Sequence, residues 1–189
     1  MSLFDDAARF AVETHADMTR KGGGLPYILH PFEVATIAAS ITSDEEVLAA
    51  ALLHDVVEDA GVDSNELRER FGDRVADLVA SETENKYPGV PKSQTWHRRK
   101  AESLEQLAAA TDDGVRVLWV SDKLANMRSL WRLVRREGDA AWSHFNQADP
   151  SEHAWYYTSV VKYTSQLSAT DAWQELDSLV SSVFGKEAE

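Results

Sequence analysis

A run of alanine and leucine that ends in a cluster of acids constrains this chain more than any other feature. Residues 48–53 are alanine or leucine, and His54, Asp55, Glu58 and Asp59 follow directly. The apolar run predicts a helix that is buried at its start and opens into a cavity at its end. Buried carboxylates are unfavourable unless positive charge compensates them, and a metal ion is the commonest such partner.

On a helix, Glu58 lies one turn beyond His54, and Asp59 lies one turn beyond Asp55. Two residues from elsewhere can complete a His/His/Asp/Asp ligand set around His54 and Asp55. They are His30, next to Pro31, and Asp122, which ends a second apolar run. Imidazole and carboxylate donors together suit a hard or borderline divalent metal such as manganese, or less specifically iron, zinc or magnesium. Taken alone, His30 is better explained as a capping or buried histidine.

Helical patterns fill the rest of the chain and predict an all-α fold of about nine or ten helices. We expect the first helix to start at a Ser2 capping box and end near Arg20. The second is expected to have His30 as its cap and Pro31 at its first position. No alternating strand pattern, internal repeat or linker is visible, so residues 1–189 are interpreted as one domain.

Composition limits the function classes. A net charge of −13 argues against a general nucleic-acid surface, which needs broad positive patches. The chain has no cysteine, which excludes thiolate chemistry, and no apolar stretch long enough to span a bilayer. No signal peptide is apparent, so we expect a cytoplasmic protein without a membrane partner. The oligomeric state stays open, with a homo-oligomer among the options.

Three motifs together resemble those of the HD-domain hydrolases of the alarmone (ppGpp) family, and most of all the stand-alone small alarmone hydrolases. They lie at residues 20–31, 54–59 and 121–128, so the resemblance covers residues from about 10 to 130. It implies an all-α HD fold with one Mn²⁺ as cofactor. It also implies removal of pyrophosphate from the 3′ position of guanosine tetra- or pentaphosphate, a small nucleotide substrate, to leave GDP or GTP.

By the same resemblance, His30, His54, Asp55 and Asp122 hold the manganese. Glu58 serves as the base for the attacking water and Asp59 as its orienting group. The residues implied to bind the substrate are Arg20, Lys21 and Asn126. Tyr156, or its neighbour Trp155, is a candidate for stacking on a purine, although aromatic residues in helices belong more often to a core.

The chain departs from the family pattern in two places, because Ser121 precedes Asp122 and because Pro88 and Pro91 reshape the loop at 85–95. Two alternatives stay open. One is an HD phosphohydrolase for another nucleotide, such as NADPH, an adenosine alarmone or a nucleoside monophosphate. The other is a nucleotide-sensing module without turnover, against which the presence of both Glu58 and Asp59 counts.

Overall fold

The computed structural model describes residues 2–20 and 24–185, and this part of the chain is all-α, as predicted. It contains nine α-helices and two 3₁₀-helices. Their bounds are α1 Leu3–Thr14, α2 Leu29–Ile41, α3 Glu45–Leu53, α4 Ser64–Phe71, α5 Asp73–Glu82, α6 Lys92–Ala109, α7 Asp113–Glu137, η1 Gly138–His144, α8 Pro150–Tyr163, η2 Ser165–Leu167 and α9 Asp171–Phe184.

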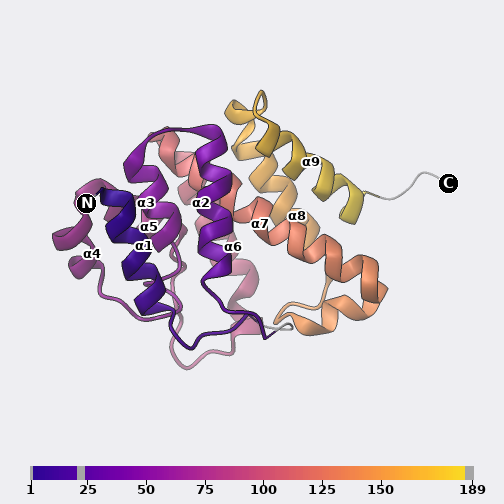
Figure 1. Ribbon diagram of the computed structural model, residues 1–189. Coiled ribbons are helices and arrows are strands. Elements are labelled where there is room, and N and C mark those ends of the chain that lie inside the picture. Colours follow the sequence, from indigo (N-terminus) through magenta and orange to yellow (C-terminus); the bar gives the residue numbers. More distant parts are fainter. Residues whose placement is uncertain (1, 21–23, 186–189) are drawn as a thin grey trace.

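Helix α7 is the central element of the bundle (Figure 1). It packs against α2, α3 and α5 on one side and against α8 and α9 on the other. Its 25 residues include a nearly continuous buried run between Val115 and Ala125. Because this run is buried almost all round and mostly apolar, the helix is stable only when other helices enclose it.

Capping residues begin most helices where the sequence suggests. The Ser2 capping box is present at α1, and Asp149 and Thr170 cap α8 and α9. Asp44 accepts from the backbone N–H of Glu46 at the start of α3. Each cap satisfies an N–H group that would otherwise lack an intrahelical partner.

Two expected helix boundaries are wrong. Helix α1 ends at Thr14 rather than near Arg20, because His15 closes the last turn and the chain then turns back. An antiparallel bridge joins Thr19 to Pro26 in this returning segment. Helix α2 begins at Leu29 with Ile28 as its cap, so His30 lies inside the first turn instead of capping it.

The acidic cluster also departs from the expected helix. Helix α3 ends at Leu53, and residues 54–59 form consecutive turns. The backbone N–H of Asp59 still donates to the carbonyl of Asp55 at 2.8 Å, so the chain remains tightly coiled there. The buried apolar run of α3 therefore delivers His54 and Asp55 at its very end, with His54 still buried and Asp55 half-buried.

Candidate metal and phosphohydrolase site

Three side chains from three helical segments meet at the centre of the bundle. His30 comes from α2, His54 follows α3, and Asp122 comes from α7. One ligand atom from each lies within 4.8 Å of the other two, and all three residues are buried. Asp122 Oδ1 is 3.0 Å from His30 Nε2 and 3.6 Å from His54 Nε2. This His/His/Asp group could bind a divalent metal ion.

The hydrogen bonds of His54 fit a metal ligand. Its Nδ1 lies 2.9 Å from the carbonyl oxygen of Ala51, which can only accept, so Nδ1 carries the proton. In the neutral ring, Nε2 then has a free lone pair directed at His30 Nε2, 3.3 Å away. Such a carbonyl contact commonly fixes the tautomer of a metal-binding histidine.

The negative charge around His54 also fits a site for a bound cation. Burial alone lowers the pKa of His54, but Asp55 and Asp122 outweigh it and raise that pKa well above its usual value. Positive charge is therefore favoured between these side chains, whether a proton or a cation supplies it.

Asp55 lies at the rim of this group. Its Oδ2 is 3.0 Å from His54 Nε2 and 3.6 Å from His30 Nε2, and its side chain is 20% exposed. The Tyr27 hydroxyl lies 2.6 Å from the same oxygen and 2.6 Å from Asp59 Oδ2. The predicted ligand Asp55 and the predicted orienting residue Asp59 are thus joined through one hydroxyl group.

Glu58 is half-buried on the same side of the site. Burial raises its pKa, and the nearby carboxylates of Glu84, Asp55 and Asp59 raise it further. Lys86 donates to the backbone carbonyl of Glu58 at 2.5 Å. A carboxylate with a raised pKa is a stronger base than an ordinary glutamate, as general-base catalysis requires.

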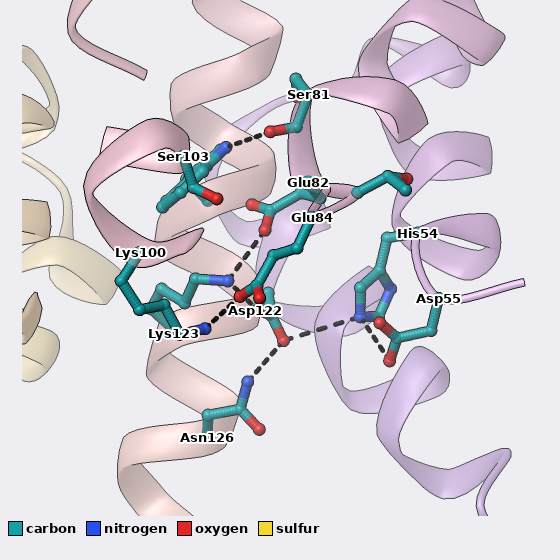
Figure 2. Close-up of polar contacts among 12 residues, drawn as sticks. His54, Asp55, Ser81, Glu82, Glu84, Lys100, Ser103, Asp122, Lys123 and Asn126 are labelled. Atoms are coloured by element: carbon teal, nitrogen blue, oxygen red, sulfur yellow. Dashed lines mark hydrogen bonds and ion pairs between the residues drawn. The ribbon is translucent and has the colours of Figure 1, made fainter. Parts of the chain in front are cut away.

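Behind the site lies a buried ion network that the sequence interpretation did not include (Figure 2). Lys123 Nζ is 2.5 Å from Asp122 Oδ2 and 2.8 Å from Glu82 Oε2. The contact with Asp122 uses Oδ2, whereas the histidines lie against Oδ1, so Lys123 fixes the orientation of that carboxylate. Burial raises the pKa of Glu82 to about 7, against the opposing effect of Lys123.

The predicted substrate residues Arg20 and Asn126 lie together at the site. Asn126 Nδ2 donates to Asp122 Oδ1 at 2.7 Å, and its Oδ1 accepts from Arg20 Nη2 at 3.1 Å. A single chain of hydrogen bonds thus leads from the guanidinium group to a carboxylate of the candidate metal site. The other predicted residue in this region, Lys21, falls outside the described residues.

Two neighbouring tyrosines of α8 have different surroundings. Tyr156 is only 3% exposed, and its ring packs edge-on against Trp96 and Tyr157. Its role in substrate binding stays a prediction. The half-buried Tyr157 hydroxyl lies within electrostatic reach of Lys123, Asp122 and Arg20; burial, the largest effect, raises its pKa to about 12. Tyr156 is also within electrostatic reach of Lys123, so both tyrosines lie near the ion network.

A second buried carboxylate borders Glu58. Glu84 forms ion pairs with both Arg99 and Lys100 of α6. Burial alone raises the pKa of Glu84, but Lys100 and Arg99 lower it overall. Through Glu84, the cationic side chains of Arg99 and Lys100 are held near Glu58, the candidate base. The sequence alone could not assign this role to either cation.

Sequence analysis missed the roles of Tyr27, Glu82 and Lys123. Tyr27 stands three residues before His30, and Lys123 directly follows Asp122, so proximity to a predicted ligand was an available signal for both. Glu82 had no such signal, because it reaches the site only through the packing of α5 against α7.

Comparisons with known proteins agree on one family for this chain. A model of the HD domain matches residues 7–150. A guanosine-3′,5′-bis(diphosphate) 3′-pyrophosphohydrolase of Aquifex aeolicus is 42% identical over 125 residues, which are 66% of this chain and 17% of that protein. A probable GTP pyrophosphokinase of Mycobacterium leprae is 37% identical over 132 residues, 69% of this chain and 16% of that protein. This chain thus matches about a sixth of the length of these curated relatives.

Two solved structures are similar over most of their length. The structure of a metazoan ortholog of SpoT, described as hydrolysing ppGpp and having a role in starvation responses, superposes with a TM-score of 0.75 at 26% identity, covering 95% of this chain and 94% of that one. A structure from Listeria monocytogenes EGD-e gives a TM-score of 0.71 at 35% identity, covering 83% of this chain and 99% of that one. Within the described residues, no helix combines the length and apolar character that crossing a membrane requires.

Proposed function

This chain belongs to the HD-domain family, in its ppGpp-hydrolase branch, and we propose on that premise that it hydrolyses the 3′-pyrophosphate of guanosine 3′,5′-bis(diphosphate). The products would be pyrophosphate and GDP, or GTP from the pentaphosphate. The observation that carries the proposal is the buried group of His30, His54 and Asp122 beside the carboxylates of residues 58 and 59.

We propose Mn²⁺ as the cofactor, held by His30, His54, Asp55 and Asp122. The mixed imidazole and carboxylate donors suit this ion, and the tautomer of His54 leaves its Nε2 free to bind. A divalent ion in this place lowers the pKa of bound water and neutralises charge on phosphoryl oxygens.

Two carboxylates of the protein would then accept the proton of the attacking water and orient that water. Glu58, with its raised pKa, accepts the proton of the attacking water, and Asp59 orients that water through its second oxygen. A general base of this kind contributes about 10²–10⁴-fold to the rate. Water would attack the phosphorus attached to the ribose, the bond from that phosphorus to the 3′ oxygen would break, and the 3′ oxygen would take up a proton to become a hydroxyl group. Cationic groups near the site would lower the barrier by stabilising the charge on the oxygens of the transferred pyrophosphoryl group.

Arg20 and Asn126 are proposed to bind the nucleotide, because they extend from Asp122 toward solvent as one hydrogen-bonded chain. The guanidinium group can form two parallel hydrogen bonds to a phosphate. Tyr157, within electrostatic reach of Arg20 and Asp122, is a further candidate for contact with the nucleotide.

The test is pyrophosphate release from ppGpp by the manganese-loaded protein, with GDP followed as co-product and an EDTA-treated control. We expect Glu58→Gln to lower kcat by about 10²–10⁴-fold. Glu105→Gln is the matched control, because Glu105 is an exposed carboxylate on α6 and its change should leave kcat unaltered. Full activity in Glu58→Gln would refute the assigned base.

The substrate itself is tested by the wild-type protein. Absence of release from a folded, manganese-bound sample would refute the ppGpp proposal. The same sample would then be assayed with NADPH, adenosine alarmones and nucleoside monophosphates. Tight nucleotide binding without turnover of any of them would instead support a sensing module.

A further inference from the structure

We infer that Tyr27 is a positioning residue that couples Asp59 to Asp55 and so holds the water-orienting carboxylate at a fixed place beside the metal site. The inference rests on the proposed function and adds a residue to its machinery. It starts from the hydroxyl of Tyr27, which lies 2.6 Å from Oδ2 of both aspartates. Distances of this length are typical of a hydroxyl that donates to a carboxylate.

Asp59 needs such a support because it is exposed. An exposed aspartate ordinarily samples several side-chain rotamers, since no packing selects among them. The carboxylate of Asp55, by contrast, is held by His54 and His30. A hydroxyl shared between the two therefore transfers the fixed position of Asp55 to the freer Asp59.

The hydroxyl also separates two negative groups. Two carboxylates placed side by side repel each other, and an interposed donor reduces that repulsion. A phenol has one proton, so Tyr27 donates to only one of the aspartates at a time. Because both acceptor oxygens lie at the same distance, rotation of the O–H bond can direct the hydroxyl hydrogen at either aspartate without moving the ring.

The backbone of Tyr27 is itself held in place. Its N–H donates to the carbonyl of Met18 at 2.9 Å, next to the bridge between Thr19 and Pro26. A second backbone bond, from Arg20 to the carbonyl of Leu25 at 2.9 Å, continues this pairing. Tyr27, which holds Asp59, is thus anchored on the same segment as Arg20, the residue proposed to bind the nucleotide.

Packing fixes the ring. The centroid of the Tyr27 ring lies 5.0 Å from that of the buried His15, whose ring is tilted relative to it. It lies 6.1 Å from the centroid of the His30 ring, and this second pair packs edge to face. These rings occupy the space into which the tyrosine could otherwise turn. Replacing tyrosine by phenylalanine removes the hydroxyl and keeps these contacts, so the variant separates positioning from packing.

The first experiment compares Tyr27→Phe with Tyr87→Phe. Tyr87 is the matched control because its hydroxyl also binds a carboxylate, that of Glu102, at 2.5 and 2.7 Å. At saturating Mn²⁺ we expect Tyr27→Phe to lower kcat about 10–100-fold with KM for the nucleotide changed less than about twofold. Tyr87→Phe should leave kcat and KM unchanged. An unchanged kcat in Tyr27→Phe overturns the inference.

A double-mutant cycle then asks whether Tyr27 acts through Asp59. In an Asp59→Asn background, adding Tyr27→Phe should lower kcat by less than about twofold, because the group that it positions is already gone. Full multiplication of the two separate effects overturns the coupling.

A readout independent of turnover is the affinity for Mn²⁺, followed by electron paramagnetic resonance of the free ion. Loss of the hydrogen bond to Asp55 should raise the dissociation constant about tenfold in Tyr27→Phe. If the wild-type protein shows no turnover of ppGpp, the proposed function fails, whereas this binding measurement still tests the link between Tyr27 and Asp55. An unchanged dissociation constant overturns that link.

Discussion

The buried Lys123 is predicted to be the most sensitive single position for stability. Its ammonium group lies between two carboxylates that are almost inaccessible to water, since the side chains of Glu82 and Asp122 are 3% and 6% exposed. Removing one partner of a buried ion pair leaves an uncompensated charge and destabilises a protein by about 3–5 kcal/mol. Lys123→Met keeps an unbranched side chain of similar size and removes the ammonium group, with its charge and its hydrogen bonds to Glu82 and Asp122.

For a domain of this size, 1 kcal/mol corresponds to a shift in Tm of about 2–4 °C, so Lys123→Met should lower Tm by about 6–20 °C. Lys162→Met is the matched control, because Lys162 is exposed on α8 and its change should stay within about 0.5 kcal/mol. Adding Glu82→Met to Lys123→Met should restore part of the loss, since the second buried charge is then removed as well.

The assay is thermal and urea denaturation followed by circular dichroism in EDTA at pH 8, where Glu82 of the wild-type protein, with a pKa of about 7, is mostly ionised. The four proteins of the Lys123 and Glu82 cycle give the coupling energy directly. The reasoning is refuted if Lys123→Met loses less than about 1 kcal/mol, or if the double variant is less stable than Lys123→Met alone.

Two other predictions concern the metal and pH. Mn²⁺ at 100 times its dissociation constant should raise the unfolding free energy by about 2.7 kcal/mol, and Asp122→Ala should abolish this gain; an equal gain in the variant would place the ion elsewhere. Burial lowers the pKa of His15, so the unfolded chain binds the proton more readily and stability should fall as pH drops below about 6.5. In His15→Phe the loss of unfolding free energy between pH 7.5 and 5.5 should be smaller than in the wild type, and equal losses would contradict the assignment.

The local character of the helices was determined by the sequence. Capping at Ser2, Asp149 and Thr170 follows from hydrogen bonds between neighbouring residues, so short-range patterns suffice to predict it. The same holds for the apolar run at the start of α7, from Val117 to Val120, which requires enclosure by other helices. His54 and Asp55 could be predicted as site residues because acids at the end of an apolar helix need compensation.

Boundaries near the site were decided by tertiary contacts. The sequence favours a first helix that reaches Arg20, but the pairing of Thr19 with Pro26 draws this segment back across the site. That return brings Tyr27 against Asp55 and Arg20 against Asn126, residues about 30 and 100 positions apart. Periodicity within one segment has no information on such contacts.

Residue types and spacing thus predicted a metal site, because ligand chemistry depends on which donors are present. They could not predict what holds each donor, because that depends on which helices pack together. The packing of α5 against α7 brings Glu82 to Lys123, and Lys123 in turn binds the second oxygen of Asp122. The sequence by itself determined the donors and the helices that carry them, and the tertiary structure decided their orientation and electrostatic support.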